Sequence, residues 1–211
     1  MIWWRYPVIA VAGYLLGNIS MGIIVASRYK MDIRNYGSGS AGTTNVLRTL
    51  GWLPSAMTLV GDALKSFAAA MLGFWLLGDP GLLVGGLCAI IGHNWPIFNG
   101  FRGGKGMACA LGMVCALNWP VALGLLGVEI LIAGLTGYVS VASIITSALF
   151  PVVIGFIYPE SGNFWVYLGF AIALAVITIF SHRSNIRRLI NGNENRINFK
   201  KIRAKPDETK G

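Results

Sequence analysis

Long apolar stretches alternate with short polar segments along almost the whole chain. A helix needs about 20 mostly apolar residues to cross a bilayer, and several of these stretches reach that length. The pattern predicts an all-α, polytopic membrane protein with seven transmembrane helices and short loops. We place the helices at residues 6–27, 53–77, 81–98, 106–118, 119–136, 138–158 and 163–181.

The segment 106–136 allows two interpretations. Asn118-Trp119-Pro120 lies near its middle, where proline would interrupt a helix and asparagine and tryptophan would suit a membrane interface. Two short helices broken at this point are one possibility. A single long, bent helix is the other.

Composition and charge support a membrane protein and predict its orientation. Hydrophobic residues make up 55% of the chain and charged residues 12%, against about 25% charged in a soluble domain. With seven spans, nearly all of the basic residues fall on one side, while Arg5 falls on the other and Lys65 within a span. The positive-inside rule then places the N-terminus outside and the C-terminus in the cytoplasm.

The last residues, 195–211, are polar and basic. We expect a disordered cytoplasmic tail there, following a transmembrane domain formed by residues 1–194. A basic tail is also typical of nucleic-acid binding, but we interpret this one as a topology anchor that contacts anionic lipid, and we expect no nucleic-acid partner. Cys88, Cys109 and Cys115 have no zinc-site spacing, so we expect packing roles for them and no metal or cofactor.

The first polar motif is Gly37-Ser-Gly-Ser-Ala-Gly-Thr-Thr-Asn-Val-Leu-Arg48. Glycines let successive backbone N–H groups converge into an anion-binding nest, which hydroxyl groups and an arginine can complete. Asn45 and Arg48 are three residues apart and share a face if a helical turn begins here. The alternative is a flexible linker with incidental serines.

The second motif, Gly92–Gly106, ends one predicted span and opens the next. Lys105 lies among three glycines at a predicted helix N-terminus, where backbone N–H groups and the helix dipole favour an anion. The motif is not a Walker A loop, because Asn99 replaces the required glycine and Gly106 the required serine or threonine. His93 is either a donor that faces a ligand or a structural residue at the helix end.

The third motif, Ser181–Glu194, follows the last span. On a continuing helix His182 and Asn185 share a face, with Arg183 and Arg187 on a neighbouring one. A basic anchor would explain Arg187 and Arg188, but it would not explain the histidine and the asparagine.

Several polar residues lie inside the predicted spans. Ser140 and Ser143 begin the sixth span, where bonding to their own backbone is as good an interpretation as a functional role. Asp62 and Lys65 can pair on one helix face, and we interpret them as a structural pair that supports the polar site. Glu129 has no evident partner in the sequence.

Together these motifs resemble those of the bacterial integral-membrane acyl-phosphate:glycerol-3-phosphate acyltransferases. The resemblance rests on Gly37-Ser-Gly-x-x-Gly-x-Thr-Asn-Val-Leu-Arg48, on the glycine-rich segment Gly92–Gly106, on Ser140 after Tyr138, and on His182-Arg-x-Asn-Ile-x-Arg-Leu189. Ser40, Thr43 and Gly137 depart from the family pattern, which usually has asparagine, alanine and a basic residue at these positions.

The resemblance implies transfer of a fatty acyl group from acyl phosphate to the sn-1 hydroxyl of glycerol 3-phosphate, giving lysophosphatidic acid and phosphate. It implies a multi-pass protein of the bacterial inner membrane, with its active site facing the cytoplasm, membrane lipid around it and no obligate protein partner. Carried over by position, the catalytic residues would be Ser38, Arg48, Lys105, Ser140, His182 and Asn185. The substrate-binding residues would be Gly39, Gly42, Thr44, Asn45, His93, Gly103 and Gly104.

The sequence contains neither a histidine and an aspartate with four residues between them nor an evident Ser-His-Asp set. Acyl phosphate is already activated, so positioning and charge neutralisation can replace a strong protein base. The alternative function is transport of a small phosphorylated metabolite. A transporter would be expected to show an internal repeat and polar residues on both faces, and the sequence shows neither.

Overall fold

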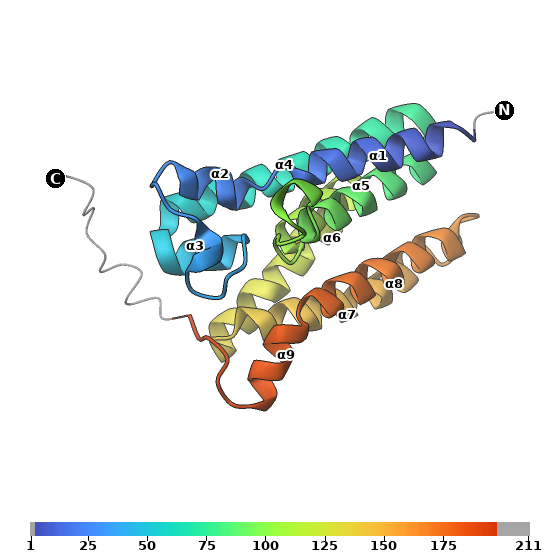
Figure 1. The fold of residues 1–211 in the computed structure, drawn as a ribbon. Helices are drawn as coiled ribbons and strands as arrows, with labels where there is room; N and C mark the ends of the chain where they lie inside the picture. Colours follow the sequence, from blue (N-terminus) through green and yellow to red (C-terminus); the bar gives the residue numbers. More distant parts are fainter. Residues whose placement is uncertain (1–2, 198–211) are drawn as a thin grey trace.

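The computed structural model describes residues 3–197, and this part of the chain contains helices and loops but no strand (Figure 1). The α-helices are α1 (Arg5–Asn18), α2 (Met21–Ser27), α3 (Thr43–Leu50), α4 (Trp52–Leu77), α5 (Asp79–Asn94), α6 (Met107–Thr136), α7 (Val139–Ile157), α8 (Phe164–Ser181) and α9 (Arg183–Ile190). Two 3₁₀ turns, at Ile33–Asn35 and Ile97–Asn99, lie in the loops. The predicted all-α class is confirmed.

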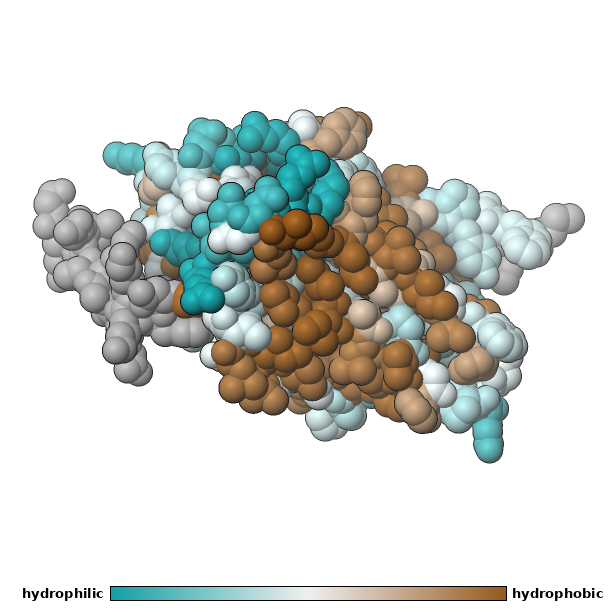
Figure 2. Space-filling view, turned by 90° about the horizontal axis from the view of Figure 1, so that it is seen from below, coloured by the Kyte–Doolittle hydropathy of each residue, from teal (hydrophilic) through white to brown (hydrophobic). Residues whose placement is uncertain are grey.

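Within the described residues, six helical segments are long and apolar enough to cross a membrane. The count is six because the predicted 106–118 and 119–136 spans are joined in α6. Large apolar side chains cover the outside of the helices: Leu135, Phe156 and Trp165 are each more than three-quarters exposed. Figure 2 shows hydrophobic residues over most of one face, with hydrophilic residues gathered toward one end. Such a surface is stable in lipid and not in water.

The first predicted span is broken where α1 ends and α2 begins. Ile19 has an extended backbone (φ −66°, ψ 100°), so its carbonyl group is released from the helical hydrogen-bond ladder. The ammonium group of Lys65, on α4, donates a hydrogen bond to this carbonyl. The break therefore supplies an acceptor for a charge inside the membrane, where an unpaired polar group would be costly.

Helix α6 doubles back on itself at Asn118, whose backbone is not helical (φ −161°, ψ 95°). Met107 and Glu129 would lie about 33 Å apart in a straight helix. Instead both contact the same turn of α7, through Ser147 and Ser143. The side chain of Asn118 donates to the hydroxyl of Tyr158, at the far end of α7. The break expected at the asparagine and the following proline is present, and the two halves of α6 lie side by side.

Small residues bring α1, α4 and α5 into close contact. A Cβ atom added to Gly13 would lie 2.5 Å from the carbonyl oxygen of Gly85, and one added to Gly17 would lie 2.1 Å from that of Ala89. Glycine at these positions lets the helix backbones approach each other closely. Helix α6 packs on α4 on one side and on α7 on the other, and α8 packs on α7. Polar segments around α2, α3 and α9 gather toward one end of this bundle (Figure 1).

Candidate active site

A cavity of about 280 Å³ lies where the three polar motifs meet. All six residues predicted to be catalytic line it: Ser38, Arg48, Lys105, Ser140, His182 and Asn185. Of the predicted substrate-binding residues, Gly42, Thr44, Asn45 and His93 also line it, whereas Gly39, Gly103 and Gly104 are not part of its wall. Segments separated by more than a hundred residues in the sequence thus form one site.

The first wall is the glycine loop, and Asn45 holds it in shape from inside. The Asn45 side chain accepts a hydrogen bond from the backbone N–H of Ser38 (2.8 Å), and its two amide hydrogens are shared among three loop carbonyl groups, those of Ile33, Tyr36 and Ser40. The loop passes close to this side chain, because a Cβ atom on Gly37 would lie 2.2 Å from its oxygen. These bonds occupy the amide of Asn45, so its position indicates support of the loop rather than direct contact with a ligand.

Lys105 approaches the cavity from the glycine-rich loop before α6. Its ammonium group has no hydrogen-bond or ion-pair partner among residues 3–197. Burial lowers its pKa to about 8, helped by repulsion from Arg188 and Arg48, while Glu194 opposes the shift. Positive charge is therefore in excess around this group, and an anion bound there would relieve the repulsion.

His182 presents an unprotonated nitrogen. Its Nδ1 lies 2.8 Å from the carbonyl oxygen of Thr178, which can only accept, so Nδ1 carries the hydrogen. Burial lowers the pKa of His182 to about 4, and the charge of Lys105 acts in the same direction. The ring is neutral at physiological pH, and its Nε2 is free to accept a hydrogen bond.

Glu194 lines the cavity, although its sequence position alone did not indicate a role. Its carboxylate accepts from Asn185 (2.7 Å), from Ser140 (3.1 Å) and from Arg188 (2.7 Å). Burial by itself would raise its pKa, but the hydrogen bonds from Asn185 and Arg188 outweigh that effect and keep the pKa below its usual value. A lone acid in a strongly basic segment was the available signal. Arg188, interpreted from the sequence as a plain anchor, instead pairs with this carboxylate.

The segment after α9 returns to the cavity, where Glu194 forms part of its wall. Arg48 donates to the carbonyl group of Asn195 (3.0 Å), and the guanidinium of Arg196 lies 4.8 Å from the ring centre of Tyr138. The backbone N–H of Ile197 donates to the carbonyl group of Gly137. The first three residues of the predicted tail therefore have defined contacts, and the remainder, residues 198–211, lies outside the described residues.

A second, apolar cavity of about 50 Å³ adjoins the first. The two cavities share part of their walls, namely Met107, Leu111, Leu126 and Glu129. The apolar cavity continues between α6, α7 and α8, where Val114, Phe150 and Leu174 line it. Glu129, which had no partner in the sequence, accepts a hydrogen bond from Ser143 (2.8 Å) at the junction.

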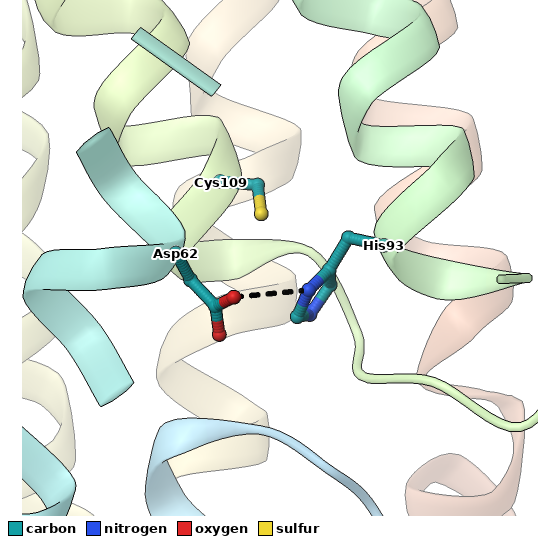
Figure 3. A group of neighbouring side chains, drawn as sticks. All are labelled: Asp62, His93 and Cys109. Atoms are coloured by element: carbon teal, nitrogen blue, oxygen red, sulfur yellow. Dashed lines mark ion pairs between the residues drawn. The ribbon is translucent and has the colours of Figure 1, made fainter. Parts of the chain in front are cut away.

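Asp62, His93 and Cys109 form a group of side chains of the kinds that can bind metals, with their ligand atoms within 4.8 Å of one another (Figure 3). The donor set does not fit a cation, because the ammonium of Lys65 lies 2.8 Å from the Asp62 carboxylate and 3.0 Å from Nδ1 of His93. Lysine already supplies the positive charge between these groups.

Helices with lipid-facing apolar surfaces surround a cavity lined by cationic and polar side chains, and this cavity shares part of its wall with an apolar one. These features are those of an integral membrane protein whose cavity suits an anionic group beside an apolar chain. A family model described as glycerol-3-phosphate acyltransferase matches residues 7–192, and the chain belongs to this family.

Known relatives and solved structures agree with this assignment. A glycerol-3-phosphate acyltransferase of Clostridioides difficile (strain 630) is 45% identical over 203 residues, covering 93% of this chain and 97% of the relative. One of Chromobacterium violaceum is 39% identical over 195 residues, covering 90% and 93%. A crystal structure of PlsY, described as an integral membrane glycerol 3-phosphate acyltransferase in its glycerol 3-phosphate form, matches with a TM-score of 0.86 and 35% identity, covering 95% of this chain and 100% of that one. Its lysophosphatidic acid form matches with a TM-score of 0.82 and 34% identity.

Proposed function

We propose that this protein transfers a fatty acyl group from acyl phosphate to the sn-1 hydroxyl of glycerol 3-phosphate, giving lysophosphatidic acid and inorganic phosphate. The observation that carries the proposal is the shared wall between the cationic cavity and the apolar cavity. An acyl phosphate has a dianionic head and an apolar tail joined at the reacting carbonyl group. Its head suits the first cavity and the first carbons of its tail the second, so the carbonyl carbon would lie at their junction.

Binding two phosphate groups in one cavity requires positive charge to offset their repulsion. In this proposal the loop around Gly39 and Gly42 holds the donor phosphate. Lys105 and the third motif hold glycerol 3-phosphate, and Arg48 lies between the two anions. Each of these groups lines or adjoins the same cavity, which supports a shared site rather than two separate ones.

The neutral ring of His182 suits the hydroxyl group of the acceptor, because its free Nε2 accepts a hydrogen bond. It would orient the hydroxyl oxygen toward the carbonyl carbon of the donor. The new ester C–O bond forms as the bond from the carbonyl carbon to the phosphate oxygen breaks, and the hydroxyl proton turns from His182 to the departing phosphate, which takes it up. Orientation of this kind can lower a barrier by about 7–11 kcal/mol without a strong protein base.

We also infer seven membrane crossings, an outer N-terminus and a cytoplasmic active site in the bacterial inner membrane. The reversal of α6 at Asn118 supports the seventh crossing, since each half of this helix runs beside α7. The distribution of basic residues supports the orientation. Residues 1–194 would form the transmembrane domain and 195–211 the tail.

The test supplies purified protein with palmitoyl phosphate and glycerol 3-phosphate and measures phosphate release. Release should require both substrates and should be lost in Arg48→Ala and Lys105→Ala, which should still insert into membranes. Glu160→Gln, an exposed acid in the loop before α8, is the matched control and should retain activity. If no phosphate is released with either substrate alone or with both together, transport of a phosphorylated metabolite would be favoured instead.

A further inference from the structure

A buried charged cluster, formed by Asp62, Lys65 and His93, lies beneath the glycine-rich loop. Lys65 is 2.8 Å from the carboxylate of Asp62, and its ammonium is 3.0 Å from Nδ1 of His93. The three side chains are at most 6% exposed. Ionisable groups in the membrane interior are expensive and are retained mainly where they serve a function.

Lys65 and Asp62 together fix the position of His93. The ammonium group of Lys65 is held by the carbonyl of Ile19 and by the carboxylate of Asp62. Nδ1 of His93 lies 3.0 Å from this ammonium group and 3.4 Å from the Asp62 carboxylate. Figure 3 shows Asp62 and His93 pointing toward each other from α4 and α5. The ring therefore cannot turn over without losing the contact with Lys65.

The same ring lies directly against the loop that carries Lys105. The backbone N–H of Gly104 donates to the carbonyl group of His93 (3.1 Å). A Cβ atom on Gly104 would lie 2.0 Å from Nε2 of His93, and the three atoms nearest to it would all belong to this ring. From the other side, the carbonyl group of Gly103 accepts from the N–H of Ala41 (3.3 Å). The loop is thus held between the His93 ring and the first polar motif.

We propose that the Asp62–Lys65–His93 cluster is a positioning device for Lys105. The cluster fixes the His93 ring, and the ring fixes the position of the Gly103–Gly104 backbone. That backbone places the ammonium group of Lys105 at the phosphate of the acceptor. His93 then acts through the loop, as a positioning residue. The inference rests on the proposed function for the identity of the anion.

A double-mutant cycle between His93 and Gly104 tests the contact. His93→Ala and Gly104→Ala should each raise the KM for glycerol 3-phosphate about tenfold or more and leave the KM for acyl phosphate within about twofold. In the double variant the new methyl group occupies the space that the ring vacated, so its KM should be lower than that of Gly104→Ala alone. If the two effects multiply as independent changes, the ring does not position the loop.

Replacing Asp62 and Lys65 together by neutral residues tests whether their charges are needed to position the loop. Asp62→Asn or Lys65→Met alone leaves an unpaired buried charge and is expected to lower stability. The double variant Asp62→Asn/Lys65→Met removes both charges and should keep near-normal thermal stability while raising the KM for glycerol 3-phosphate. A stable double variant with the wild-type KM would overturn the inference. Where His93→Ala does not fold, His93→Asn retains an acceptor for Lys65 and replaces it in the cycle.

Cys109→Ala is the matched control, because Cys109 lies beside His93 but makes no contact that supports the loop. It should leave both KM values unchanged. A rise in the KM for glycerol 3-phosphate would contradict the proposal that the loop is positioned through the His93 ring. The two proposals fail in different ways. Wild-type protein that releases no phosphate from the two substrates refutes the proposed function, whereas active wild-type protein with independent effects in the cycle refutes the positioning role alone.

Discussion

The pH dependence of glycerol 3-phosphate use follows from the position of Lys105. Burial, followed by repulsion from Arg188 and Arg48, lowers its pKa from 10.5 to about 8. About nine-tenths of the substrate-free molecules carry the charge at pH 7, and about one-tenth at pH 9. Because kcat/KM reports on the free enzyme, kcat/KM for glycerol 3-phosphate should fall about tenfold per pH unit above pH 8.

The decline should be weaker in kcat. A bound phosphate dianion stabilises the ammonium group, so the pKa of Lys105 rises in the complex and the alkaline limb moves to higher pH. The assay is phosphate release between about pH 6 and pH 10, with palmitoyl phosphate saturating and glycerol 3-phosphate limiting. The rate without enzyme is subtracted at each pH, because acyl phosphates hydrolyse in base.

Two variants separate Lys105 from other titrating groups. Arg188→Gln removes a repelling cation and should move the alkaline limb upward. Lys105→Arg retains its charge throughout this range, so any activity that remains should lack the limb. A wild-type profile that stays level to pH 10, or an unchanged limb in both variants, would refute the reasoning.

Four further substitutions, one of them a control, test packing and support. Gly112→Ala should lower the stability of the protein in detergent by about 1–3 kcal/mol, because the new Cβ would lie 1.9 Å from the carbonyl oxygen of Ala63. Gly124→Ala is the control and should not lower the stability, because nothing lies within 4 Å of the new Cβ. Equal effects of the two substitutions would contradict the close packing at Gly112. Asn45→Ala should lower kcat/KM and destabilise the protein by about 2 kcal/mol, since its four hydrogen bonds are lost; normal activity would remove the support role. Cys109→Ala should retain full activity in the phosphate-release assay, and inactivity would undermine its assignment as a packing residue.

The sequence was sufficient to predict where the long apolar helices lie, because a spanning helix must present an apolar surface along its full length, but it did not predict the break at Ile19. Trp52–Leu77 and Phe164–Ser181 match the predicted boundaries to within a residue. Pro120 indicated the break in α6, since its ring and missing N–H are local properties. The direction of the second half depends on the backbone of Asn118 and on its contact with Tyr158, neither of which leaves a local pattern.

The site was predictable in its members and less so in their roles. Glycines, hydroxyl groups and cations in three motifs indicated an anion site, and these residues meet in one cavity. The support given by Asn45 could not be distinguished from ligand contact, because an amide suits both. Glu194 was missed because its importance depends on burial against Ser140 and Asn185, which only the folded chain brings about.

The wall shared by the two cavities has a kinetic consequence. Met107, Leu111 and Leu126 border both the polar and the apolar space, so the substrates of the proposed reaction would arrive from different phases. Glycerol 3-phosphate would enter from water, and its supply would follow its bulk molar concentration. Acyl phosphate would enter sideways from the bilayer, where its mole fraction among the lipids is the effective concentration. Diluting the membrane with inert lipid at constant total acyl phosphate should then slow the enzyme, although no concentration in the surrounding solution has changed.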